Sequence, residues 1–347
     1  RRMNAMFSRY SRQTLFAPIG EEGQTKLARA RVAVVGVGAL GTVAAELLVR
    51  AGVGYVRLID RDVVEPSNLQ RQSLYDETDA AESVPKAVAA ARKLQAINTA
   101  VEIDAHVADL HPYNAETLLS DVDLIVDGTD NFPVRFLIND VAVKHRIAWI
   151  YGGAVRSHGV VMPIVPGETP CLRCLFDRPP EDGTAETCDT VGVIVPITHL
   201  IASLEAAEAL KWLVGDRKNL SRSMTTVDVW HNRFAAVDVS RSRKPDCPAC
   251  GAGRFEFLDA AAAEDTVETL CGRDAVQIVP VRPRSPDLSL LENRLSRLGT
   301  VERTPYLLKF RPDPSRTIML FPDGRAIVQG TDDPTAAKTL YARYVGV

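Results

Sequence analysis

A glycine-rich turn is the first feature of the sequence that could bind a ligand. It follows the apolar run Val32–Val35 and contains Gly36, Gly38 and Gly41 in the spacing Gly-x-Gly-x-x-Gly. In this spacing the first glycine permits a tight turn, the second lets the backbone approach phosphate, and the third lets the next helix pack on the strand. The positive end of that helix would face the anion. The turn alone is compatible with NAD, FAD, S-adenosylmethionine or ATP.

Polar residues beyond the turn favour a ligand with a phosphate tail. Asp60 ends the next apolar run, at about the twenty-residue distance expected of a carboxylate that binds ribose hydroxyls. Asp62 lies two residues further on and is an equal candidate for the ribose. Asn68 and Arg71 follow in a polar segment where a triphosphate could extend.

Three more charged residues occur where predicted strands end or helices begin. Lys86 follows Pro85 at a predicted helix start, where a cation opposes the helix dipole unless a phosphate lies nearby. A solvated lysine is the alternative. Asp127 and Asp130 come at the carboxyl end of a strand, and two aspartates beside phosphate indicate a hard cation such as Mg²⁺. The alternative for Asp130 is a turn or an N-cap before a helix that starts at Pro133.

Cysteine spacing predicts a metal site. Cys171 and Cys174 form one Cys-x-x-Cys pair, and Cys247 and Cys250 form another. Two such pairs can build one closed, structural Cys₄ site for Zn²⁺, although a pair of unmetallated thiol turns is the alternative. Cysteines used in this way favour a reducing compartment, hence a cytoplasmic protein. Cys188 follows a polar stretch, with no adjacent basic residue to lower its pKa.

The elements that would position these residues alternate between strands and helices. Strands are predicted at Val32–Gly36, Tyr55–Asp60, Val101–Val107 and Leu124–Asp127, and helices at Ala39–Ala51, Pro85–Ile97 and Pro133–His145. This order predicts an α/β, Rossmann-like fold with helices on both faces of the sheet. Hairpins predicted at Trp149–Val165 and Met224–Val239 make the far side antiparallel and the sheet mixed.

A second domain is predicted after a change in composition at Asp259–Glu264. We expect residues 1–258 to form the nucleotide-binding domain with the Cys₄ site, and residues 265–347 to form a small α+β domain of unknown role. The predicted elements of the small domain are a strand at Ala275–Val279, a helix at Leu288–Leu298, strands at Tyr306–Arg311, Thr317–Phe321 and Ala326–Gln329, and a helix at Pro334–Tyr344.

Composition excludes two classes of function. The net charge of −3 over 347 residues, without a dense basic run, argues against nucleic-acid binding. The longest apolar stretch, Val191–Val214, contains Glu205, Glu208 and Lys211 at helical spacing and therefore predicts a buried helix rather than a membrane span. No signal peptide is recognisable at the start.

Taken in order, these motifs make the chain similar to the ThiF/MoeB family, the bacterial relatives of ubiquitin-activating enzymes. The resemblance runs from about Tyr10 to Cys250. It is carried by Arg9–Gln13, the glycine turn, Asp60–Asp62, Ser67–Gln72, Pro85–Lys86, Thr129–Asn131, Pro170–Phe176, Cys188 with Val191–Val193, Glu205–Lys211 and Cys247–Cys250.

The resemblance implies an adenylyltransferase. It would use ATP to adenylylate the C-terminal Gly-Gly carboxylate of a ubiquitin-like sulfur carrier of the ThiS or MoaD type, releasing pyrophosphate, for thiamin, molybdopterin or related sulfur transfer. By the same resemblance, Asp60 or Asp62 would hold the ribose, Arg71 and Lys86 the phosphates, and Asp130 the Mg²⁺ ion.

Two further roles are implied by the resemblance. Arg12 would reach into the ATP site of a second subunit, which implies a homodimer. In the family a cysteine at the position of Cys188 can attack the acyl-adenylate or link covalently to the carrier, but not every member needs it. From position alone, His231 and Asn232 are candidates for contact with the carrier tail.

Other functions fit fewer of these residues. An NAD-dependent oxidoreductase would explain the glycines and Asp60, but not Arg71, Lys86, Asp130 or the paired cysteines. A tRNA-modifying dehydratase of the same superfamily, which adenylylates a small carboxylate, does not depend on the cysteine pairs. A non-catalytic scaffold that keeps the nucleotide fold would not need the charged residues Arg71, Lys86 and Asp130.

Overall fold

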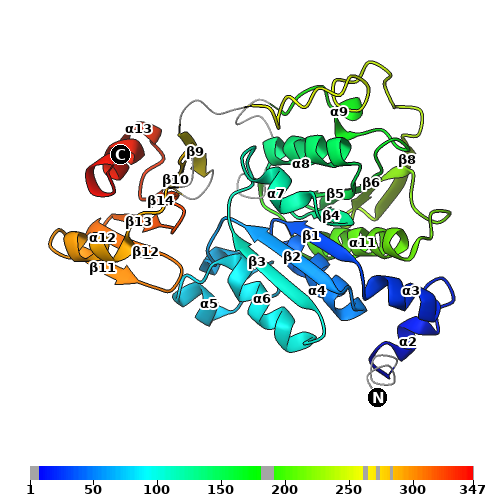
Figure 1. Cartoon of the computed structure of the whole chain (residues 1–347), viewed down its shortest axis with the longest axis horizontal. Helices are drawn as coiled ribbons and strands as arrows, with labels where there is room; N and C mark the ends of the chain where they lie inside the picture. The colour runs from blue at the N-terminus through cyan, green and yellow to red at the C-terminus, as the bar shows by residue number, and fades with distance from the viewer. Residues whose placement is uncertain (1–7, 181–190, 261–264, 271–273, 282–283, 347) are drawn as a thin grey trace. The chain divides into compact units, whose positions relative to one another are not determined.

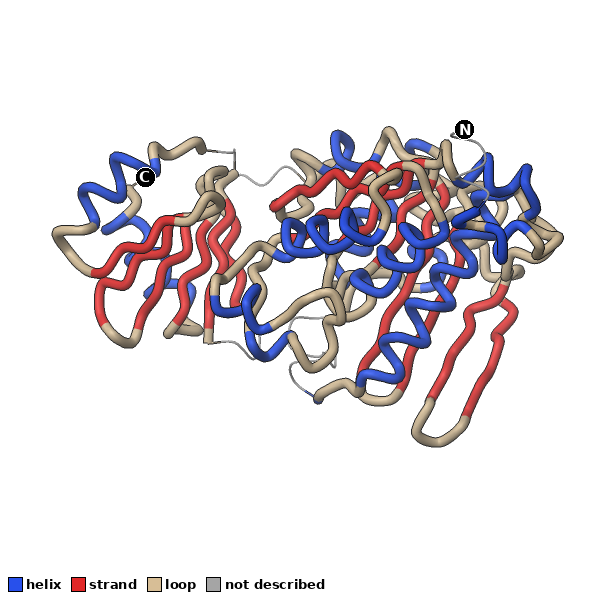
Figure 2. The backbone as a smooth tube through the Cα atoms, turned by 90° about the horizontal axis from the view of Figure 1, so that it is seen from below, coloured by secondary structure: helices blue, strands red, loops and turns tan. Residues whose placement is uncertain are grey.

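The computed structural model describes residues 8–180, 191–260, 265–270, 274–281 and 284–346. The chain divides into two compact units, Arg1–Ala260 and Ala261–Val347. Each unit has its own sheet and its own hydrophobic core. Figure 2 distinguishes the strands of the two sheets, in red, from the helices, in blue. Cys188 and residues 261–264 of the predicted linker lie outside the described residues.

The first unit is built on an eight-stranded mixed sheet in the order β3-β2-β1-β4-β5-β6-β7-β8. Neighbours from β3 to β5 pair in parallel, and neighbours from β5 to β8 pair antiparallel, which confirms the predicted mixed sheet. The strands are β1 (Arg31–Val35), β2 (Tyr55–Asp60), β3 (Glu102–Val107), β4 (Leu124–Asp127), β5 (Ala148–Val155), β6 (His158–Ile164), β7 (Ser223–Asp228) and β8 (Arg233–Asp238).

Helices cover both faces of this sheet (Figure 1), as the sequence predicts. One face packs against α4, α6 and α11, and the other against α7 and α8. The helical segments are α2 (Ser11–Thr14), α3 (Gly20–Leu27), α4 (Gly41–Ala51), the 3₁₀ turn η1 (Pro66–Asn68), α5 (Glu77–Ala81), α6 (Lys86–Ile97), α7 (Ala115–Leu119), α8 (Phe132–His145), α9 (Leu172–Leu175) and α11 (Val195–Val214).

The register of the central strands brings three chain segments together at one edge of the sheet, the edge formed by the carboxyl ends of β1, β2 and β4. Val35, the last residue of β1, pairs with Ile59 of β2 and with Asp127 of β4. Strands buried on both faces read as continuous apolar runs, which is why β1 and β4 are apolar almost throughout. The glycine turn, Asp60 and the segment after Asp127 therefore emerge at the same edge, where ligands of open α/β sheets bind.

The second unit is a six-stranded antiparallel sheet in the order β11-β12-β13-β14-β10-β9, packed against two helices. The prediction missed β9 and β11, because both are short, polar edge strands that end the sheet. The elements are β9 (Thr266–Leu270), β10 (Ala275–Val279), α12 (Leu288–Leu295), β11 (Thr300–Arg303), β12 (Leu308–Asp313), β13 (Arg316–Leu320), β14 (Ala326–Gln329) and α13 (Pro334–Tyr344).

The long apolar stretch near residue 200 forms one helix of the first unit. It becomes α11, which packs in the core and is capped after Val214 by Gly215 in the left-handed conformation. Across the described part of the chain, no helix combines the length and the apolar character that a membrane crossing requires.

Candidate nucleotide and metal sites

The glycine turn has little room where it meets β4. Gly36 has φ +80°, and a Cβ there would lie 2.8 Å from the carbonyl carbon of Gly128. A Cβ on Gly41 would overlap the Gly36 carbonyl oxygen. At Gly38, in contrast, the nearest atom to an added Cβ is Nε2 of Gln72, at 3.7 Å. The protein's own packing therefore requires Gly36 and Gly41, whereas Gly38 has room that a bound phosphate could use.

Asp60 links the glycine turn to the end of β2 by hydrogen bonds. One of its carboxylate oxygens accepts from the backbone N–H of Val37 at 2.7 Å, and the other accepts from the N–H of Asp62 at 2.7 Å. Burial raises the pKa of this carboxyl, although both backbone donors oppose the rise. Asp60 therefore has a structural task in the chain itself, besides any contact with a ligand.

Lys86 is buried rather than solvated, contrary to the simplest interpretation of the sequence. Its side chain is 3% exposed, and Nζ lies 3.1 Å from a carboxylate oxygen of Asp62. The Lys86 amide also donates to the Asp62 carbonyl oxygen. Lys86 is the first residue of α6, so its ammonium group lies at the positive end of a helix. Lys86 and the start of α6 therefore supply positive charge here, which Asp62 partly neutralises.

The polar segment after β2 forms a compact loop beside the glycine turn. Asn68 is 1% exposed, and its side-chain oxygen accepts from the backbone N–H of Glu65 at 2.9 Å. Arg71 is partly exposed, and its guanidinium donates to the Ser67 carbonyl oxygen at 3.1 Å. Gln72 is buried and reaches Gly38. In this structure the Asn68 side chain stabilises the loop conformation, and Arg71 supplies a positive charge that is partly exposed to solvent.

Asp130 lies in a short loop between β4 and α8. Its residue is exposed, and none of the described residues forms a hydrogen bond or an ion pair with its carboxylate. The N-cap of α8 is Asn131, whose side chain accepts from Val134 at 3.2 Å. The capping alternative for Asp130 is therefore wrong.

Arg135 is a residue of this region that sequence analysis overlooked. It lies on α8, only 5% exposed, and its Nε donates to Asp127 at 2.9 Å. Its Nη2 donates to the carbonyl oxygens of Thr129, at 2.6 Å, and Gly152, at 2.9 Å. The signal was a single arginine within an apolar helical stretch, which predicts a buried ion pair but does not identify its partners.

Arg12 lies at a different end of the first unit. It is exposed on α2, and the next residue, Gln13, donates to the carbonyl oxygen of Ala51 at 2.8 Å. Ala51 is the last residue of α4, whereas the glycine turn lies at the start of that helix. An eleven-residue helix is about 16 Å long. Arg12 therefore lies about one helix length from the glycine turn of its own chain.

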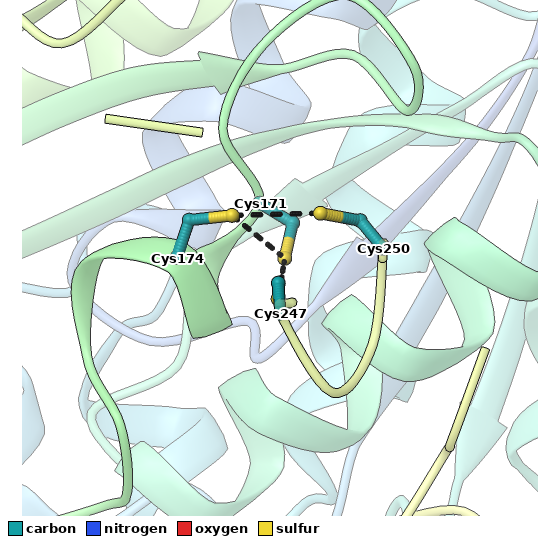
Figure 3. Close-up of side chains that lie close together, drawn as sticks. All are labelled: Cys171, Cys174, Cys247 and Cys250. Atoms are coloured by element: carbon teal, nitrogen blue, oxygen red, sulfur yellow. Dashed lines mark hydrogen bonds between the residues drawn. The ribbon is translucent and has the colours of Figure 1, made fainter. Parts of the chain in front are cut away.

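The two cysteine pairs come together in space. Figure 3 shows the side chains of Cys171, Cys174, Cys247 and Cys250 converging on one point. All four sulfurs lie within 4.8 Å of one another, with separations of 3.6 Å for Cys171–Cys247 and 3.4 Å for Cys174–Cys250. Four sulfurs at 2.3 Å from one tetrahedral zinc ion would lie about 3.8 Å apart. The donor set and spacing fit a tetrahedral thiolate metal site.

The thiols also influence one another's ionisation. Contact with Cys171 lowers the pKa of the Cys174 thiol to about 4, and the Cys174 side chain raises the pKa of Cys171. Burial raises the pKa of Cys250 to about 11. Four thiols packed together cannot all ionise without a cation, so the cluster is organised for a positive ion.

His231, a candidate for carrier contact, lies in the turn between β7 and β8. Its Nδ1 is 2.7 Å from a carboxylate oxygen of Asp228, and Asn232 in the same turn has φ +52°. Although desolvation opposes the change, the hydrogen bond with His231, followed by contacts from Ser157 and from His158 at 3.2 Å, lowers the pKa of Asp228 to about 2. Asp228 therefore joins the β5–β6 turn to the β7–β8 turn, and His231 contributes a hydrogen bond to Asp228 within its own turn.

Comparisons with known proteins identify relatives of this chain. A model of the ThiF family matches residues 10–249. The sulfur carrier protein ThiS adenylyltransferase of Bacillus subtilis is 44% identical over 342 residues, covering 98% of this chain and 100% of that protein. The sulfur carrier protein adenylyltransferase of Thermus thermophilus is 42% identical over 248 residues, covering 70% of this chain and 90% of that protein.

Solved structures show the same fold. The crystal structure of E. coli MccB with MccA-N7isoASN matches with a TM-score of 0.62 at 23% identity, covering 70% of this chain and 75% of that one. At this level of identity the likeness concerns the fold alone.

Proposed function

The chain belongs to the ThiF family, and we propose that it uses ATP to adenylylate the C-terminal Gly-Gly carboxylate of a ubiquitin-like sulfur carrier, releasing pyrophosphate. The observation that carries this proposal is the likeness to the ThiS adenylyltransferase of Bacillus subtilis along nearly the whole chain. The enzyme is a nucleotidyltransferase, and its product supplies sulfur transfer for thiamin, molybdopterin or a related compound.

The reaction demands charge neutralisation more than proton transfer. A terminal carboxylate has a pKa of about 3.5 and is already ionised at neutral pH, so no general base is needed. The carboxylate must, however, approach the α-phosphorus of a polyanion. Two unit charges about 4 Å apart interact by roughly 4 kcal/mol at an effective dielectric of about 20. Fixed positive groups at the sheet edge can offset this repulsion.

We assign the positive groups to Arg71 and Lys86. Lys86 is held at the first turn of α6, and Arg71 belongs to the loop that reaches the glycine turn. We assign the ribose hydroxyls to Asp62, because both oxygens of Asp60 already accept from backbone amides. Asp130 would hold Mg²⁺, which supplies further neutralisation of the phosphates when bound.

We further propose that the enzyme is a homodimer. Arg12 lies about one helix length from its own glycine turn, so it can serve a nucleotide only in another subunit. Leu15 and Phe16, in the same segment, are 74% and 61% exposed, which favours burial against a partner. The covalent role of Cys188 remains a separate proposal, because this residue lies outside the described part of the chain.

The four clustered cysteines would hold Zn²⁺ as a structural ion. All four positions are protein ligands, so no coordination site is left for substrate. Four free cysteines gathered in one cluster also support a cytoplasmic location, where thiols stay reduced.

Carrier-dependent exchange of labelled pyrophosphate into ATP tests the proposed reaction. With a ThiS-type carrier ending in Gly-Gly, we expect rapid exchange that falls at least about 100-fold in Arg71→Ala, because phosphate neutralisation is lost. A thermal-shift measurement with different nucleotides distinguishes this function from that of an NAD-dependent oxidoreductase. Mg²⁺ with ATP should stabilise the protein and NADH should not; stabilisation by NADH alone, without any exchange, would contradict the proposal.

A further inference from the structure

The carboxylate of Asp130 depends on its backbone for its position. The residue is exposed, and no described side chain braces the carboxylate. A metal ligand on a loop loses affinity if the loop samples several conformations, because ordering the loop then opposes binding. The residues on either side of Asp130 must therefore supply the rigidity.

Both flanks of Asp130 are held by specific hydrogen bonds. On one side, a carboxylate oxygen of Asp127 accepts from the Thr129 amide at 2.9 Å and from the Thr129 hydroxyl at 2.6 Å. On the other side, Asn131 caps α8. The remaining polar group of Thr129, its carbonyl oxygen, accepts from Arg135 at 2.6 Å.

Arg135 joins three elements at this point. Its guanidinium bonds to Asp127 at the end of β4, to Thr129 in the loop, and to Gly152 in β5. The group is confined between two aromatic rings, because Arg135 Cζ lies 5.0 Å from the ring centroid of Phe132 and 5.3 Å from that of Tyr151. A planar guanidinium can donate in three directions at once, whereas the ammonium of lysine is a point charge on a flexible stem.

We propose that Arg135 is a positioning residue, whose guanidinium fixes the Gly128–Asn131 loop and so holds Asp130 in the orientation that binds the divalent cation of the nucleotide. This inference rests on the proposed metal role of Asp130. It adds a residue that touches neither nucleotide nor carrier and acts through the loop backbone. Supporting residues of this kind typically change metal affinity by about 10–100-fold when they are replaced.

Arg135→Lys tests the proposal, with Arg173→Lys as its matched control. Arg173 is also a buried arginine of this unit, 7% exposed, paired with Glu256 at 2.9 Å and lying against an aromatic ring, that of Phe257. It lies on α9, between two cysteines of the cluster, and not beside the Asp130 loop. Both substitutions keep the charge and remove the guanidinium, so they perturb packing in comparable ways.

The direct readout is binding of Mn²⁺, a paramagnetic probe for the Mg²⁺ site, in the presence of α,β-methylene ATP, followed by electron paramagnetic resonance. We expect Arg135→Lys to weaken Mn²⁺ binding about 10-fold or more, and Arg173→Lys to stay within about twofold of wild type. Melting temperatures measured in parallel show whether the loss follows general stability. Wild-type Mn²⁺ affinity in Arg135→Lys, or an equal loss in Arg173→Lys, would overturn the inference.

Two further variants keep the test decisive. If Asp130→Asn binds Mn²⁺ as wild type does, the metal role of Asp130 fails and the inference fails with it. If Asp130→Asn loses Mn²⁺ and Arg135→Lys does not, the inference alone fails. Should Arg135→Lys not fold, Thr129→Val removes only the hydroxyl bond to Asp127, and we expect a smaller loss of Mn²⁺ affinity in the same direction; an unchanged affinity there would count against the proposal.

Discussion

Two regions of the first unit hold ionisable side chains in different ways. One is the proposed nucleotide edge, formed by the glycine turn, Arg71, Lys86 and Asp130, and the other is the cysteine cluster. At the nucleotide edge, the side chains come from separate segments, and they range from buried Lys86 to exposed Asp130. In the cysteine cluster, four thiols from two short turns point at one another and three of them are buried. A substrate site must admit and release its ligand, whereas a structural metal site is closed by its own ligands.

Helix α8 connects these two regions. Its first turn follows the Asp130 loop, and further along the helix Asn139 accepts from the backbone N–H of Leu172, next to Cys171, at 2.8 Å. Despite this connection, each region should have its own experimental signature. Damage to the nucleotide edge should reduce catalysis without unfolding the chain, and damage to the cluster should reduce stability first.

The largest expected effect is on catalysis at Lys86. Lys86→Met removes a cation from the proposed phosphate site, and we expect pyrophosphate exchange to fall by about 10²–10³-fold. Lys93→Met is the matched control, because Lys93 lies about two turns further along the same helix and pairs with Asp76 and Asp79, each at 2.6 Å. Equal losses of exchange in the two variants would remove the distinction between a substrate site and a structural ion pair.

The second-largest expected effect is a loss of protein stability when Cys247 is replaced. Cys247→Ser removes one of four metal ligands from a closed site, and we expect a fall in melting temperature of about 10 °C, on the order of 4 kcal/mol. Adding a strong chelator to the wild-type protein should give a loss of similar size, and exchange measured well below the transition should persist. Complete loss of exchange in a folded Cys247→Ser variant would place the cluster in the catalytic machinery.

The smallest effect concerns Asp140, on the helix between the two regions. Burial raises the pKa of its carboxyl to about 6, while the backbone N–H groups of Phe257 and Leu258 partly oppose the rise. In the unfolded chain this carboxyl has its ordinary pKa of 3.8, so the buried anion destabilises the fold above about pH 6 and this penalty disappears as the pH falls towards 4.

Asp140→Asn should therefore stabilise the protein at pH 8 by an amount on the order of 2 kcal/mol, and should make no difference near pH 4. Chemical denaturation of both proteins at the two pH values measures this. A variant that is less stable than wild type at pH 8 would show that the ionised carboxyl, through its two backbone hydrogen bonds, is favourable.

The features that were predictable from sequence are those encoded locally. The central strands are apolar runs ending at glycine or aspartate, and the register of β1, β2 and β4 then brings their ends together. The Cys-x-x-Cys spacing encodes each half of the cluster, and the family resemblance indicates that the halves meet. The same local signals predicted that the glycine turn, Asp60 and the segment after Asp127 lie together, whereas their roles with a nucleotide stay predictions.

The remaining features depend on contacts between distant segments. Nothing adjacent to Arg135 in the sequence indicates that its acceptors are Thr129 and Gly152, because the latter belongs to a different strand. The burial of Lys86 depends on Asp62, twenty-four positions earlier in the chain. The short edge strands β9 and β11 contain too few apolar residues for a clear alternating pattern.

Intact-mass spectrometry of the carrier tests the proposed reaction most directly. A ThiS-type carrier ending in Gly-Gly, incubated with enzyme, Mg²⁺, ATP and pyrophosphatase, should gain the mass of one adenylyl group, that is AMP less water, at its C-terminus. The same carrier without its final glycine should gain none. An enzyme that gives rapid ATP turnover but never adds AMP to the intact carrier would contradict the account, because the charged edge would then serve a different acceptor.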